Sequence, residues 1–296
     1  MNPKKIYTVI AIVFAVTYGY NLYWFFRTLI DAGDYGFQIG AFIRYIPVFA
    51  GIAGVVIFIA SQFKRSNLLR IIMCLEIMSF PFLVFWYVQF FSQTYGPDNR
   101  PPDVNWTFYV GCVINLSLII CSITGLRMLS FNKTAKLNFI ELGNERTGQF
   151  WPASAGLRFI NRLVDAIVVA FIVLTNLQVF SSQLRRHFEF STEIFIAIEI
   201  PVLLIYYIVL EGIFNTTAGK CATGTTIVNE YGVRPGFAKI LGRTFCRLIP
   251  FEAFSFFGAE PRGWHDTMTN TYVVESINKE DVAMEDIILD AELNMR

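Results

Sequence analysis

Six long apolar stretches, separated by polar segments, dominate the hydrophobic pattern of the chain. They cover residues 6–30, 37–60, 68–91, 108–129, 160–180 and 194–214. Each is long enough for the roughly 20 residues that a helix needs to cross the hydrocarbon core of a bilayer. Only structures that pair every backbone polar group internally are tolerated there. The pattern therefore predicts an all-α membrane protein with about six transmembrane helices.

Composition supports this prediction. Of the 296 residues, 54% are hydrophobic and only 16% are charged, against about 25% charged in ordinary soluble domains. Lys4 and Lys5 precede the first apolar stretch, which is too long for a signal peptide and lacks a cleavage pattern, so we expect an uncleaved first helix. The net charge of +1 gives no overall field that would attract nucleic acid.

Basic residues in the loops indicate the orientation in the membrane. They occur before the first predicted helix and then after every second one, in three groups: Lys4 and Lys5; Lys64, Arg65 and Arg70; Arg127, Lys133, Lys136 and Arg146. All three groups therefore lie on the same side of the membrane. Because basic loops stay on the cytoplasmic side, both termini are predicted to be cytoplasmic. The loop with Arg185, Arg186 and His187 is the exception, since this topology places it outside.

The chain divides into four parts. Residues 1–130 form a four-span half, and residues 131–157 form a mixed-charge cytoplasmic linker rich in turn residues. Residues 158–275 contain two more spans, and residues 276–296 form an acidic tail in which "VAMEDIILDAEL" indicates a short helix. The chain shows no internal repeat of the kind found in many transporters.

The segment 237–250, "FAKILGRTFCRLIP", carries a basic residue at every fourth position: Lys239, Arg243 and Arg247. This spacing places the three on one face of a helix, with apolar residues over much of the remainder. We predict an amphipathic helix in the cytoplasmic membrane interface, with these three residues bound to lipid headgroups. A role in substrate binding is the alternative.

A Gly-Lys step lies in the polar stretch "EGIFNTTAGKCATGTTIVNEYGVRPG", residues 211–236. Gly212 and Gly219 are too far apart for a phosphate-binding P-loop, and Cys221 stands where that motif needs a hydroxyl. The stretch is better explained as a turn beside the membrane, with Lys220 at the level of the headgroups. "TTIV" (225–228) and "NTYVV" (270–274) are β-branched and are predicted to pair in a small cytoplasmic β element.

Four segments in order resemble the RDD family of bacterial membrane proteins: 152–169, 211–232, 240–250 and 263–274. The resemblance covers roughly residues 150–275. It places the family's arginine and two aspartates at Arg158, Asp165 and Asp266, and its glycine-lysine loop at Gly219-Lys220. Cys221 departs from the pattern, because a basic residue is common there. The resemblance implies a multi-pass protein of the bacterial inner membrane, in a family often suspected of transport, with its ligand generally unknown.

Four polar residues of the fifth stretch, Arg158, Asn161, Arg162 and Asp165, share one helical stripe. Arg162 can reach Asp165 one turn away, and Arg158 can reach Asp266 or the acidic tail. Ionisable residues in a span are costly and usually face a partner or water. They form either a structural network of ion pairs, which we favour, or a polar pathway for an ion or proton.

Two further carboxylates lie inside predicted spans. Glu76 precedes Pro81 in the third, and Glu199 precedes Pro201 in the sixth. Each is either a neutral, hydrogen-bonded acid or paired across helices, with Arg44 as one possible partner. Broken helices with carboxylates also coordinate small cations in transporters. Glu76, Glu199 and Asp165 are therefore the candidate groups for binding an ion or proton.

Catalytic and metal-binding motifs are absent from the sequence, so neither an enzyme nor a cofactor is predicted. The five cysteines show no pairing pattern and are interpreted as structural. Two functions remain open. One is a transporter that exchanges a monovalent cation for protons, and the other is a non-transporting scaffold or regulatory subunit of a membrane complex. Expected partners are membrane lipids and either a second copy of the chain or other membrane subunits.

Overall fold

The computed structural model describes residues 3–31, 39–94, 106–136, 138–142, 145–149, 152–184, 192–249, 252, 255 and 263–278. The chain forms two compact units. The first contains residues 1–126 and 170–198, and the second contains residues 127–169 and 199–296. Two long helices, α5 (Ala155–Leu184) and α6 (Thr192–Phe214), contribute to both units.

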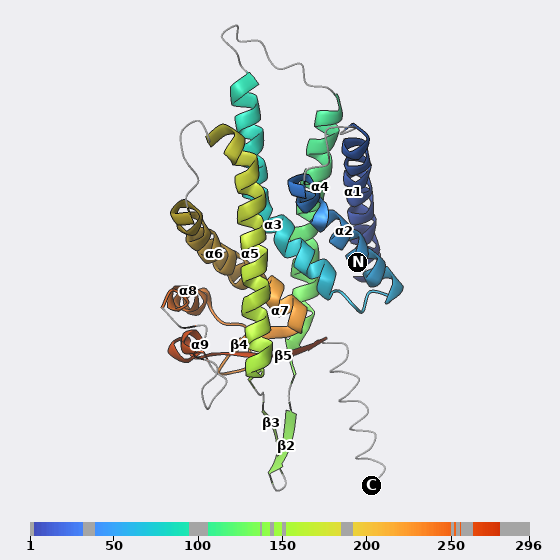
Figure 1. The fold of residues 1–296 in the computed structure, drawn as a ribbon. Helices are drawn as coiled ribbons and strands as arrows, with labels where there is room; N and C mark the ends of the chain where they lie inside the picture. Colours follow the sequence, from blue (N-terminus) through green and yellow to red (C-terminus); the bar gives the residue numbers. More distant parts are fainter. Residues whose placement is uncertain are drawn as a thin grey trace. The chain divides into compact units, whose positions relative to one another are not determined.

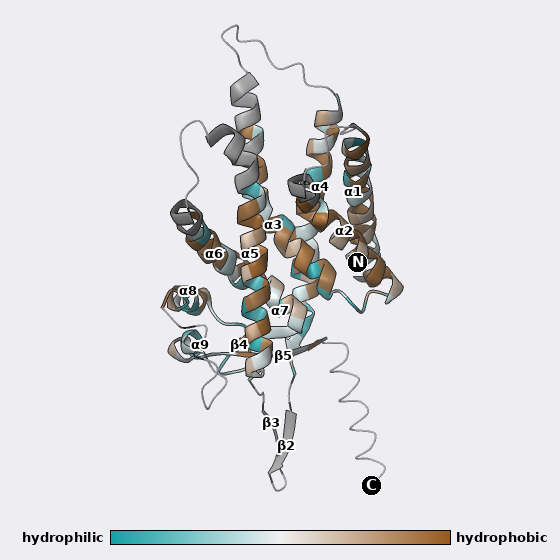
Figure 2. Cartoon of the chain, viewed as in Figure 1, coloured by the Kyte–Doolittle hydropathy of each residue, from teal (hydrophilic) through white to brown (hydrophobic). Residues whose placement is uncertain are grey.

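The first unit is helical. Its elements are α1 (Pro3–Asp31), α2 (Ile39–Ala60), α3 (Asn67–Thr94) and most of α4 (Trp106–Phe131) (Figure 1). These helices carry apolar side chains on their outer faces as well as inside, such as Val16 at 62% and Val113 at 64% exposure. In Figure 2, brown marks hydrophobic residues, and it covers much of these helices. A helix that is apolar all round is suited to lipid.

Four helices in the described part of the chain are long and apolar enough to cross a membrane. They are Lys4–Ile30, Asn67–Phe85, Phe108–Phe131 and Ala197–Phe214, with a shorter apolar helix at Tyr45–Ala60. The predicted fold class, a mostly helical membrane protein with a small β element, is confirmed. The predicted count of six spans stays a prediction.

Close packing joins the first three helices. A Cβ atom on Gly51 would lie 2.3 Å from the ring of Tyr18, so the glycine lets this side chain pack directly against α2. Tyr18 in turn donates a hydrogen bond of 3.0 Å to the carboxyl group of Glu76 on α3. Where α2 meets α3, Gly54 faces the backbone of Leu69.

The second unit contains the ends of α5 and α6 together with three short helices. These are α7 (Ala218–Thr223), α8 (Phe237–Cys246) and α9 (Trp264–Thr269). Its three-stranded antiparallel sheet has the order β1-β5-β4, with β1 at Lys133–Ala135, β4 at Thr225–Asn229 and β5 at Thr271–Asn278.

The strand pairing predicted from the sequence is confirmed. Thr226 of β4 faces Val274 of β5, in the antiparallel register that brings "TTIV" beside "TYVV". The sequence prediction missed β1, which adds Ala135 to a small core with Val228 and Val274. It also missed a hairpin in the predicted linker, formed by β2 (Asn138–Leu142) and β3 (Glu145–Gln149). The helix predicted in the acidic tail lies outside the described residues.

Candidate functional site

The polar stripe of α5 faces the interior of the second unit. Arg158, Asn161 and Asp165 are buried, and Arg162 is partly buried. The apolar residues between them are exposed, at 44–47% for Phe159, Ile160 and Leu163. The helix therefore turns its charged side inward and its apolar side outward, as its periodicity predicts.

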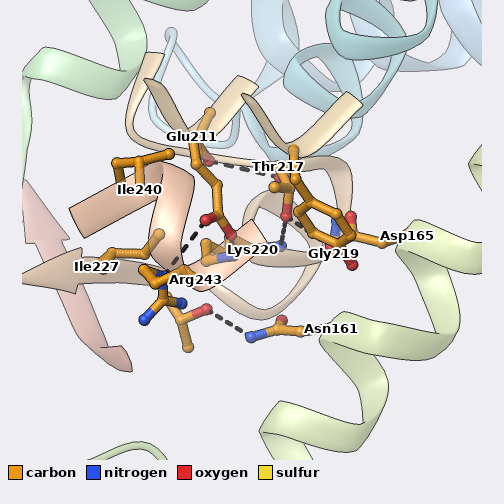
Figure 3. Close-up of polar contacts among 12 residues, drawn as sticks. Asn161, Asp165, Glu211, Thr217, Gly219, Lys220, Ile227, Ile240 and Arg243 are labelled. Carbon is orange, nitrogen blue, oxygen red and sulfur yellow. Dashed lines mark hydrogen bonds and ion pairs between the residues drawn. The ribbon is translucent and has the colours of Figure 1, made fainter. Parts of the chain in front are cut away.

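Asp165 is held by three neutral donors. Its carboxylate accepts hydrogen bonds from the Tyr206 hydroxyl at 2.6 Å, from the Thr217 hydroxyl at 2.9 Å and from the backbone N–H of Gly219 at 2.7 Å (Figure 3). Tyr206 also accepts from the N–H of Ala218. Asp165 makes no ion pair with any residue in the described part of the chain. The predicted Arg162–Asp165 contact is thus replaced by hydroxyl and amide contacts.

The Gly-Lys loop binds the protein's own carboxylate. Thr217 caps α7, since its hydroxyl accepts from the N–H of Lys220 while donating to Asp165. A Cβ atom on Gly219 would lie 2.1 Å from the backbone oxygen of Asn161, so only glycine allows this approach of α7 to α5. At the start of α7, Asp165 therefore occupies the place that a phosphate would take in a phosphate-binding loop.

Glu211, at the end of α6, is fully buried and binds three cations. Lys220 contacts one carboxylate oxygen at 2.7 Å, Arg247 contacts the same oxygen at 2.7 Å, and Arg243 contacts the other oxygen at 3.4 Å. Figure 3 shows Glu211 directed toward Arg243 and Lys220. Lys220 is only 3% exposed. Its charge is therefore bound inside the protein, and its predicted position at the level of the lipid headgroups stays a prediction.

Asp266 is the second buried anion of this network. It pairs with Arg158 of α5 and Arg243 of α8, and it accepts a hydrogen bond from Thr271. Burial alone would raise the pKa of Asp266, but Arg243, His265 and Arg158 outweigh it and hold the pKa far below its usual range. Asp266 therefore stays ionised and links α5 to α8, and it is one of the two partners expected for Arg158.

The basic stripe of α8 points inward. Arg243 is fully buried and Arg247 is 8% exposed, and both are engaged with carboxylates. The outward side chains of this region are apolar, with Phe237 at 57% and Phe245 at 56% exposure. The headgroup role predicted for Arg243 and Arg247 does not fit this placement, because buried acids compete for them. Lys239 alone lies near the surface, where it pairs with Glu230 at 2.6 Å.

His265 and Glu252 form a further contact beside Asp266. Burial lowers the pKa of His265, and Arg243 and Arg247 add to this effect, against the opposing carboxylates Asp266 and Glu252. Burial raises the pKa of Glu252, but its contact with His265 and the nearby arginines lower the pKa below its usual value overall. A neutral imidazole beside an ionised carboxylate is the resulting state near neutral pH.

These groups surround a small cavity of about 40 Å³. Five cationic side chains line it: Arg158, Arg162, Lys220, Arg243 and Arg247. Asp165 and Glu252 are the carboxylates on its wall. Arg162 makes a hydrogen bond of 3.5 Å to the Tyr207 hydroxyl. Such a volume admits a few water molecules, since one water molecule needs roughly 10–15 Å³.

The other two predicted carboxylates lie apart from this network. Glu76 belongs to the first unit, where Tyr18 is its hydrogen-bonding partner. Glu199 lies on α6 and is partly exposed. The side chain of Arg44, named as a possible partner, is outside the described residues. The ion- or proton-binding role of Glu76 and Glu199 stays a prediction.

Residues 152–270 match the model of the RDD family. We refer to this matched part of the chain as the RDD domain. The match covers α5 to α9 and β4, and it ends just before β5. The chain has no match among curated proteins or among solved structures.

Within the RDD domain, the three family residues fall into two contacts. Arg158 and Asp266 pair directly, whereas Asp165 binds the start of α7. The sequence analysis did not identify Tyr206, Glu252 or the two arginines that bind Glu211. A carboxylate at the end of an apolar helix, immediately before a Gly-Lys loop, was the available signal for Glu211.

Proposed function

We propose that this multi-pass membrane protein exchanges protons for a small monovalent cation, with Asp165 of the RDD domain as the group that carries the proton. The observation that supports this proposal is the surroundings of Asp165. Its carboxylate is 1% exposed, lies on the wall of a polar cavity and is bound by hydroxyl and amide donors rather than by a cation.

The contrast with Glu211 and Asp266 explains why Asp165 is the favoured carrier. Those two carboxylates are each bound by two or three buried cations. Protonating either would leave buried positive charges without a counter-charge, which is costly. Protonating Asp165 requires only that a neutral donor rotate or release its hydrogen bond.

The same surroundings suit a small cation. The hydroxyl oxygens of Tyr206 and Thr217 lie within 2.9 Å of the Asp165 carboxylate. A hydroxyl group has lone pairs as well as a proton, so each can turn from donor to ligand when a cation replaces the proton. In this proposal, the proton and the cation compete for Asp165, which couples their movements.

Transport by the full-length chain in sealed proteoliposomes tests the proposal. A pH-sensitive dye inside the vesicles should report proton movement when Na⁺, K⁺ or Li⁺ is added outside. D165N should abolish this movement, and D165E should retain part of it. K239Q, which changes a surface pair on α8, is the matched control and should behave like the wild type. Equal proton movement in folded D165N protein would overturn the proposal.

A scaffold or regulatory subunit is the second candidate, and the ion-pair network favours it. Buried cations bind Glu211 and Asp266 and fasten α5, α7 and α8 together, as a rigid platform for another membrane subunit would require. Proteoliposomes that show no cation-driven proton movement, together with a partner that co-purifies with the wild type and is lost on deleting residues 279–296, would favour this function.

A further inference from the structure

The cavity of the RDD domain carries an excess of positive charge. Arg158, Arg162, Lys220, Arg243 and Arg247 line it, and the carboxylates on its wall or in contact with its cations are Asp165, Glu211, Glu252 and Asp266. The remaining titratable groups on the wall are Tyr207 and His265. With both neutral, five cations face four carboxylates in this described cluster, which leaves one positive charge in excess.

One of the cations that line the cavity has an unused donor. The side chain of Arg243 is fully buried, and its Nε and Nη1 atoms contact Glu211, Asp266 and Thr271. Its Nη2 atom is buried and has no hydrogen-bond partner among the described residues. Leaving a buried donor unsatisfied costs about 1–3 kcal/mol, and more for a charged group. A ligand that accepts a hydrogen bond at this point would remove that cost.

We propose that the cavity binds a small monovalent inorganic anion of the halide class, held by Arg243 and by the surrounding cations. The excess of one positive charge fits one monovalent anion, and the unused Arg243 N–H groups provide its hydrogen bonds. The volume of about 40 Å³ accepts an ion of this size with a water molecule. The site shares its cavity wall with Asp165, but it does not require that Asp165 exchange protons for a cation.

Two substitutions test the site without breaking the ion pairs of Glu211 or Asp266. Arg162 lines the cavity, and among the described residues it contacts Tyr207 through a 3.5 Å hydrogen bond and over its ring. Glu252 lines the same cavity with a negative charge. R162Q therefore removes one positive charge from the wall, and E252Q removes one negative charge. Anion affinity should change in opposite directions, because each effect is electrostatic.

The experiment measures the thermal unfolding midpoint of the full-length protein in mild detergent. Chloride or bromide replaces gluconate at constant ionic strength. A ligand that binds the folded state raises the midpoint in a saturable way, and this is expected for the wild type. The apparent affinity for bromide should fall by roughly tenfold in R162Q and rise by a similar factor in E252Q, as expected for one unit charge in a partly screened site. K239Q, the matched loss of a surface charge, should leave it unchanged.

Two results would overturn the proposal. One is the absence of a saturable halide effect in the wild type, and the other is an equal effect in R162Q and E252Q, which would indicate general screening. Crystals grown in bromide provide a second measurement, independent of the variants' stability. An anomalous peak within hydrogen-bonding distance of Arg243 Nη2 supports the site, whereas a position filled by water alone contradicts it.

Discussion

The carboxylate of Asp165 accepts the backbone N–H of Gly219 at 2.7 Å. This contact joins α5 to the start of α7. A glycine stands at position 219 because α7 approaches the backbone oxygen of Asn161 too closely for a Cβ atom. A loop that resembles a phosphate cradle in composition is therefore filled by a side chain of the same protein. The signature aspartate of α5 and the Gly-Lys loop are two halves of one structural unit.

Substituting Gly219 by alanine should disrupt this unit. The new Cβ atom would meet the backbone oxygen of Asn161 at 2.1 Å, and a backbone atom cannot rotate away as a side chain can. We expect G219A to lower the free energy of unfolding by about 3 kcal/mol, as overpacking does in a closed site. Thermal unfolding of the full-length protein in detergent measures this loss.

Gly156 provides the matched control, because a Cβ atom there meets nothing within 4 Å. G156A in the first turn of α5 should be neutral or stabilise the protein by up to about 1 kcal/mol, through helix propensity. Equal unfolding midpoints for the two variants would show that α7 does not pack on α5 as described.

Asp266 should matter more for stability than either arginine that binds it. D266N leaves Arg158 and Arg243 buried without this counter-charge, and we expect a loss of about 3–5 kcal/mol. R158Q leaves Asp266 paired with Arg243, so about half that loss is expected. The order of the two unfolding midpoints checks this. R158Q at least as destabilising as D266N would contradict it.

The arrangement also predicts the result of exchanging the two charges. R158D combined with D266R again places opposite charges at positions 158 and 266. The new arginine would, however, lie beside Arg243, which contacts Asp266 in the native protein. Like charges in a buried site repel, so the double variant should be no more stable than D266N alone. Recovery of the wild-type midpoint would show that Arg243 is not a true partner of Asp266.

His265 should make the RDD domain less stable in mild acid. Burial lowers its pKa below the ordinary 6.5, so below neutral pH the unfolded chain binds this proton more readily than the folded chain. Stability is then fully present above about pH 6.5 and decreases as pH falls toward the lowered pKa. Glu252 and Asp266, whose pKa values are also lowered, act in the same direction only below about pH 4.5.

H265Q separates these contributions. The variant cannot take up the proton, so its unfolding midpoint should change less between pH 7 and pH 5 than that of the wild type, while the steeper loss below pH 4.5 remains. Parallel curves for the two proteins across the whole range would exclude His265 as the group responsible.

The helical period of α5 and the β-branched strands were predictable because each depends on residues close in sequence. The partners in the site were not. The same i to i+4 spacing that aligned Lys239, Arg243 and Arg247 on one face could not show which way that face turns. Glu211 and Asp266, 32 and 23 residues away from Arg243, decide its direction. Local pattern gives the stripe, and only tertiary contacts give its partners.

Arg247 and Lys239 should therefore respond differently to substitution, although sequence spacing makes them equivalent. Arg247 contacts Glu211 at 2.7 Å and lies 3.8 Å from the ring centre of Tyr207. R247M removes both contacts from a buried site while Glu211 keeps Lys220 and Arg243, so we expect a loss of about 2 kcal/mol. K239M removes a partly exposed pair and should change the unfolding midpoint little.

Binding to vesicles separates this structural role from a headgroup role. Arg247 is bound to Glu211 inside the protein, so its loss should not change lipid binding. R247M, purified in detergent and kept at a temperature at which it is folded, should bind anionic vesicles as the wild type does. Only Lys239 of the three is placed to contribute, by about 1 kcal/mol for a basic residue near the surface. A decrease in anionic-lipid binding by R247M larger than that by K239M would contradict the inward placement of Arg247.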